Sequence, residues 1–77
     1  MTEFDGLKRS YISALHVGMA TGANREQSKN GNEILHKFCE GLVENSQYSD
    51  EAKQAMKHEL KMLKEVLSKE IEEFYTR

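Results

Sequence analysis

The sequence contains no proline, no tryptophan and only one cysteine among its 77 residues. The single Cys39 excludes an internal disulfide, and no apolar run approaches the length of a membrane span or a secretory signal. We therefore expect a cytoplasmic protein with no membrane partner. Because the chain begins with methionine and carries no recognisable tag, we also expect a complete small gene product.

The chain also lacks a strong excess of either charge. Eleven basic and thirteen acidic residues give a net charge of −2, so neither a strongly basic nucleic-acid binder nor an acidic DNA mimic is indicated. A chain of this length forms one domain, here 1–77, and buries only about 60 to 65% of its unfolded surface. Association with a second copy is a common way to cover the rest, so we expect a homo-oligomer.

What the sequence does contain is a long amphipathic pattern over residues 50–75. Ser49 is a favourable N-cap residue, and two acidic residues follow it. Apolar residues then recur every three or four positions, which predicts one helix with an apolar face. We assign that face to the oligomer interface; its residues are Met56, Leu60, Leu63, Leu67, Ile71 and Phe74.

Two further helices precede this one. Thr2 and Asp5 have the spacing of a capping box, which predicts a helix over about 3–20. Apolar residues from Ile34 to Val43 predict a second helix over about 32–45, with an optional extension back to residue 24. Its broad apolar face, which includes Ile34, Phe38 and Leu42, is expected in the middle of the bundle. The fold class is therefore all-α, with three helices, and the long third helix is expected to overhang the other two.

Residues 22–32 lack any apolar side chain larger than alanine. They are therefore expected to be the most exposed segment and to contribute nothing to a buried face. Two interpretations remain open for this segment, a flexible connector or a polar contact loop.

The third helix also carries a basic edge. We call Lys53, Lys57, Lys61 and Lys64 the lysine ridge, because their spacing of four, four and three places them along one side. Together with Arg25 and Lys29 they are the candidate partner-binding residues. A solvated helix face is the more common meaning of such a run of charges. An antiparallel dimer of third helices would instead place the ridge opposite Glu65, Glu70 and Glu73 of the second copy.

No catalytic, metal or cofactor site is predicted. His36 and Cys39 lie three residues apart, and His16 or His58 could add a ligand, but the paired cysteines of a structural zinc site are missing. Cys39 lies among apolar residues in the middle of a helix, which favours an inert buried thiol. We therefore expect a protein that is not an enzyme.

The remaining function classes are binding functions. We expect a small protein-binding regulator or inhibitor, adaptor-like and of the kind that viruses encode to modulate host machinery, an analogy based on size and class. The alternative is a small nucleic-acid-binding regulator that uses the lysine ridge, since phosphates bind lysine side chains. No motif in the chain names a family.

Overall fold

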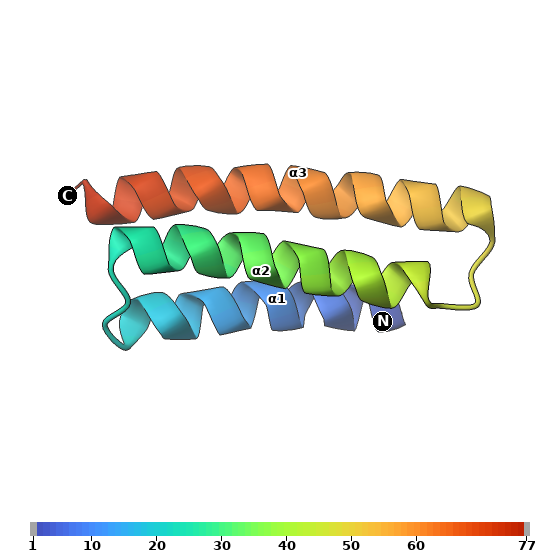
Figure 1. Ribbon diagram of the computed structural model, residues 1–77, viewed down its shortest axis with the longest axis horizontal. Helices are drawn as coiled ribbons and strands as arrows, with labels where there is room; N and C mark the ends of the chain where they lie inside the picture. Colours follow the sequence, from blue (N-terminus) through green and yellow to red (C-terminus); the bar gives the residue numbers. More distant parts are fainter. Residues whose placement is uncertain (1, 77) are drawn as a thin grey trace.

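The computed structural model describes residues 2–76 and shows three α-helices with no strand in that range. The helices are α1 (Glu3–Ala20), α2 (Arg25–Glu44) and α3 (Asp50–Tyr75). Each runs antiparallel to its neighbour in sequence, so α1 and α3 run in the same direction (Figure 1). The predicted all-α, three-helix fold is confirmed.

The structure shows the capping groups from which the starts of α1 and α3 were predicted. Thr2 and Asp5 form a capping box at α1, and the Ser49 hydroxyl accepts a hydrogen bond from the Ala52 amide at 3.2 Å. Gly22 adopts φ +111°, a left-handed conformation that residues with a Cβ rarely take, so the chain turns there after α1.

The second helix begins at Arg25, so the extension back from residue 32 forms in full. Asn24 is its N-cap, and the side chains of Asn24 and Gln27 form a second capping box. The Asn24 side chain accepts from the Gln27 amide at 2.8 Å, and the Gln27 side chain accepts from the Asn24 amide at 2.9 Å. These contacts satisfy two backbone donors that a helix end leaves unpaired, which offsets the cost of Gly31 within the helix.

The apolar core lies where the three helices meet. All three helices contribute side chains to it. The buried apolar residues are Tyr11, Leu15, Met19, Cys39, Val43, Leu60, Leu67 and Ile71. Because α2 packs against both other helices, it is the central element of the fold.

Residues 22–32 are largely exposed, as predicted, but contrary to the prediction they contribute two side chains to the buried face. Ser28 and Asn32 are buried, at 3% and 2% exposure, on the side of α2 that faces the other helices. This part of the prediction is wrong because it counted only apolar side chains. A short polar side chain can be buried at low cost when hydrogen bonds satisfy it, so neither a flexible connector nor a contact loop describes this segment.

The predicted overhang of α3 is confined to its start, which extends past the end of α2 (Figure 1). The last turn of α3 instead packs against α2. The Tyr75 hydroxyl donates to the Ala23 carbonyl at 2.5 Å and lies 2.7 Å from the Ser28 hydroxyl. These contacts fix the last turn of α3 against the start of α2, which is one to two turns longer than its apolar pattern indicates. As Figure 1 shows, α2 lies beside α3 along most of its length.

Candidate interaction surface

The lysine ridge lies along the seam between α3 and α2. Lys57 pairs with Glu44, and Lys64 pairs with Glu33 at 3.2 Å. Lys57 also lowers the pKa of the Glu44 carboxyl by donating a hydrogen bond to it. Among residues 2–76, Lys53 and Lys61 form no ion pair. Half of the ridge is therefore already paired within the molecule.

Arg25 and the acidic end of α3 also find partners inside the chain. Arg25 pairs with Glu72, and the His16 ring lies 2.6 Å from the Glu70 carboxylate. These carboxylates lie near the C-terminus of α3, where the negative end of the helix dipole destabilises negative charge. Basic groups of α1 and α2 offset this unfavourable position, so a dimer is not needed to explain the acidic end of α3.

Lys29, one turn beyond Arg25 on α2, lies in a shallow hollow between α2 and α3 that Lys64, Lys69 and Ser68 also line. Glu33 and Glu72 line the same hollow and each pairs with a basic residue. The structure thus brings Lys29 and Lys64 together, but it mixes them with carboxylates of opposite charge. An anion would meet both signs of charge in this hollow.

The predicted oligomer residues lie mainly inside the monomer. Leu60, Leu67 and Ile71 are core residues with 0 to 2% exposure. Met56 and Leu63 pack against that core and are partly buried, whereas Phe74 remains 43% exposed. The three core side chains offer no surface to a second copy, because α1 and α2 already cover them.

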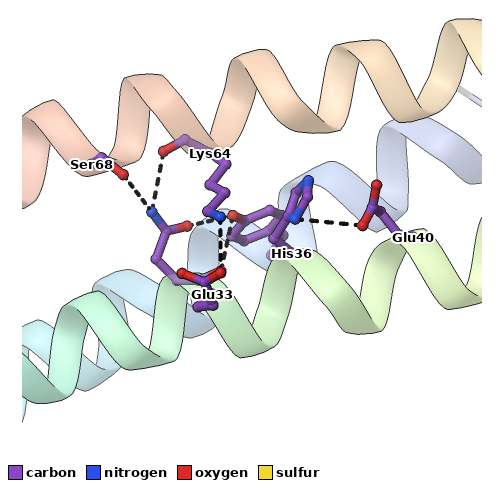
Figure 2. Close-up of polar contacts among 7 residues, drawn as sticks. Glu33, His36, Glu40, Lys64 and Ser68 are labelled. Atoms are coloured by element: carbon purple, nitrogen blue, oxygen red, sulfur yellow. Dashed lines mark hydrogen bonds and ion pairs between the residues drawn. The ribbon is translucent and has the colours of Figure 1, made fainter.

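Asn32 forms the centre of a buried polar cluster that joins all three helices. Its side-chain amide donates to the Lys64 carbonyl and to the Ser68 hydroxyl, each at 3.1 Å, while its carbonyl oxygen accepts from the Tyr11 hydroxyl. Figure 2 shows these contacts reaching from α2 toward Lys64 and Ser68 of α3. Such a cluster fixes the relative positions of the helices, because sliding one of them would leave buried polar groups unpaired.

His36 lies one turn beyond Asn32 and is only partly satisfied. Its Nδ1 is 3.7 Å from the Glu40 carboxylate, as drawn in Figure 2, whereas its buried Nε2 has no hydrogen-bond partner within the described structure. An unpaired buried nitrogen costs about 1 to 3 kcal/mol.

The histidines and the cysteine do not form a metal centre. In the part of the chain that the structure describes, no three His, Cys, Asp or Glu side chains gather closely enough to hold a metal ion. Cys39 is 2% exposed, and burial raises the pKa of its thiol. The protonated thiol is a poor nucleophile, so Cys39 has the properties of a core side chain.

The most unusual exposed feature lies on α2. We call Ile34, Phe38 and Leu42 the apolar row; they are spaced four residues apart and are 66%, 63% and 46% exposed. Four-residue spacing places them along one side of the helix. The sequence had placed these residues in the core, because their pattern merges with that of the buried Cys39 and Val43.

The apolar row is separated from the charged residues of α2. From residue 26 to 44 the helix carries six charged residues: Glu26, Lys29, Glu33, Lys37, Glu40 and Glu44. Viewed down the helix axis, at 3.6 residues per turn, these charged residues occupy one arc about 80° wide. The apolar row occupies a different arc, also about 80° wide. The first arc faces α3, because Glu33 and Glu44 pair with its lysines.

One side of α1 is uncharged between residues 10 and 17, although the exposed Glu3 lies on the same side at the start of the helix. Ser10, Ala14 and Val17 are exposed and share one side of α1, and Val17 is 58% exposed. The ion-pairing residues Lys8 and His16 lie on the side toward α3. We call the apolar row together with Ser10, Ala14 and Val17 the uncharged face.

A hollow of about 270 Å³ adjoins the apolar row at its Leu42 end, and the charged Glu3 is one of its lining residues. Phe4 and Leu7 of α1, Leu42 of the apolar row and Tyr48 of the α2–α3 connection are among the residues that line it. A hollow of this size and lining accommodates one or two apolar side chains of a binding partner.

The exposed apolar residues of α3 have a different setting. Met62 and Val66 are also four residues apart, at 54% and 59% exposure. However, Lys61, Glu65 and Lys69 are their exposed neighbours on the helix. Single apolar side chains among charges are ordinary on protein surfaces, so this pair is a weaker candidate than the uncharged face.

None of the described helices, from residue 3 to residue 75, is long and apolar enough to cross a membrane. Comparison with known proteins finds no matching family model, no matching curated protein and no matching solved structure.

Proposed function

We propose that this protein is a small, non-enzymatic, protein-binding regulator that works in the cytosol through its uncharged face. The observation that carries the proposal is the exposed apolar row of α2, set apart from every charged residue between positions 26 and 44. An apolar helix face that the protein's own core does not use is typical of a protein-binding site.

Phe38 is the expected anchor of this contact. It lies in the middle of the apolar row and is 63% exposed, so a partner can bury most of its ring. Aromatic side chains near the centre of an interface often account for much of its affinity.

The lysine ridge supports the nucleic-acid alternative less well. Two of its four lysines already pair with glutamates of α2, and Glu33 and Glu44 would repel phosphates at the same place. Lys53 and Lys61 alone would provide a weak and scattered contact. Lys61, which lies on α3 and outside the uncharged face, is therefore the control position for the experiment that tests Phe38.

The experiment introduces a photoreactive phenylalanine analogue at position 38, or at position 61 as a control, in the cell that makes the protein. We expect a discrete protein adduct from position 38 and none from position 61. The purified partner should then lose at least about 10-fold in affinity with Phe38→Glu, as expected when a charge enters an apolar contact, and should bind Lys61→Glu normally.

Two results would contradict the proposal. One is the absence of any protein adduct at position 38. The other is binding that disappears after nuclease treatment and weakens with Lys61→Glu rather than with Phe38→Glu. The second result would support the nucleic-acid alternative, because phosphate contacts depend on lysine charge and on salt concentration.

A further inference from the structure

The apolar row has a symmetry of its own. Phe38 is its centre, and Ile34 and Leu42 lie four residues to either side. We infer that the uncharged face binds a second copy of this chain, with the two α2 helices antiparallel about a two-fold axis beside Phe38. This inference rests on the proposed function, because it names the partner of the same surface.

The antiparallel arrangement matches the side chains along the row. The two Phe38 rings meet at the axis, and Ile34 of each copy meets Leu42 of the other, so all six apolar side chains are covered in one contact. Gly41 lies three residues beyond the centre, and a Cβ there would meet no atom within 4 Å, so there is open space beside the row.

The distribution of charge favours a second copy over a different partner. The axis places Phe38 beside its own equivalent and position 34 beside position 42, so a charge at the centre of the row, or like charges at its two ends, would repel across the contact. The six charged residues of α2 between positions 26 and 44 all lie on the arc outside the row. A different protein could provide an opposite charge, so a contact with one would not require this exclusion.

The available area is sufficient. A standard interface covers about 800 Å² on each partner, which is about 15% of the 5421 Å² accessible surface of this chain. The molecule measures 42 × 20 × 18 Å, so one long face has roughly the required size. Ser10, Ala14 and Val17 of α1, with the hollow beside Leu42, extend the contact beyond the row.

This dimer differs from the one that the sequence predicts. Pairing through α3 would need Leu60, Leu67 and Ile71, which the monomer buries. It would also need free carboxylates at the end of α3, where Glu70 and Glu72 have partners within the chain. Pairing through α2 leaves the core and these contacts unchanged.

The first measurement is the mass in solution by sedimentation velocity over a range of concentrations. We expect a species of twice 8.9 kDa that dissociates on dilution. Phe38→Glu should raise the dimer dissociation constant at least about 100-fold, because the axis brings two like charges into one apolar contact. Lys61→Glu, on the exposed surface of α3, should leave it unchanged, and circular dichroism checks that each variant is helical.

A charge exchange tests the antiparallel register without relying on Phe38. Ile34→Lys alone, and Leu42→Glu alone, should each weaken the dimer. The double variant should recover at least about 10-fold of the lost affinity, because each new lysine then lies beside the new glutamate of the other copy. A parallel arrangement would place like charges together and would give no recovery.

The outcomes separate this inference from the proposed function. A wild-type chain that stays at 8.9 kDa at high concentration, or a double variant without recovery, overturns the inference. If such a monomeric chain still gives a position-38 adduct with a different protein, the proposed function stands. A dimer that persists in Phe38→Glu overturns the inference as well.

Discussion

At the scale of single residues, the interior of this protein is specified by polar groups as much as by apolar ones. Asn32 is 2% exposed and makes hydrogen bonds to α1 and to α3. Apolar side chains pack acceptably in several registers, whereas hydrogen-bonding groups are satisfied in very few. We conclude that Asn32 selects one register of the three helices.

Asn32→Ala is expected to lower the free energy of unfolding by about 2 kcal/mol, because the Tyr11 and Ser68 hydroxyls lose their buried partner. Urea denaturation followed by circular dichroism measures the change. Asn30→Ala is the matched control, since Asn30 is exposed on the same helix and its replacement should change stability by less than about 0.5 kcal/mol. Equal effects of the two substitutions would contradict the role of the cluster.

His36→Leu is expected to stabilise the protein, in contrast to Asn32→Ala. The substitution removes the unpaired Nε2 and keeps an apolar side chain of similar size, so the free energy of unfolding should rise by about 1 kcal/mol. His58→Leu, at an exposed position, is the control for histidine replacement. A loss of stability in His36→Leu would show that Nε2 is hydrogen-bonded in solution, for instance to a buried water molecule.

At the scale of helices, α2 shows how far the sequence could be interpreted. The bounds of the first and third helices were predictable, because capping residues and apolar spacing agree there. The start of α2 was not, because Ser28 and Asn32 are polar and only their partners Tyr75 and Tyr11 make burial favourable. The spacing of Asn24 and Gln27 was the local signal that favoured the earlier start.

The candidate surface was harder to predict than the fold. Apolar spacing on α2 and α3 is equally regular, and spacing alone cannot distinguish a side chain in the core from one at an interface. Ile34 and Phe38 were therefore assigned to the interior, and Leu60 and Ile71 to the surface. A signal was present in the positions of the charged residues, since those of α2 avoid the arc that carries the apolar row.

Asn24→Ala is expected to lower the free energy of unfolding by about 1 kcal/mol, because the capping box of α2 is lost. Asn24→Gly should cost only a few tenths of a kcal/mol, since glycine is itself tolerated at an N-cap. Thermal and urea unfolding of both variants measures the difference. Similar losses for alanine and glycine would show that the side chain does not cap the helix.

At the scale of the whole molecule, two buried groups, a thiol and a phenol hydroxyl, make the stability of the fold depend on pH in the alkaline range. Burial raises the pKa of the Cys39 thiol above 9.0 and that of the Tyr11 hydroxyl above 10.0. Between its ordinary and its raised pKa, each group is protonated in the folded chain and ionised in the unfolded one. Because the unfolded chain then binds fewer protons, stability falls as pH rises.

We therefore expect the free energy of unfolding to decline from about pH 9 upward, while the contribution of these two groups is fully present below that pH. Urea midpoints between pH 7 and about pH 11 measure the slope. Cys39→Ala and Tyr11→Phe should each flatten the decline, whatever their effect on stability at pH 7. An unchanged slope in the double variant would assign the decline to other groups.

The contact of Tyr75 with Ala23 also has a consequence for the order of folding. Connections of only four and five residues join the helices, so most packing forms between segments that are close in sequence, which is typical of chains that fold in microseconds to milliseconds. Tyr75 and Ala23 are 52 residues apart, so their hydrogen bond closes a large loop of the chain. We therefore expect this bond to form late, after α2 and α3 have paired, and to be among the first to break during unfolding.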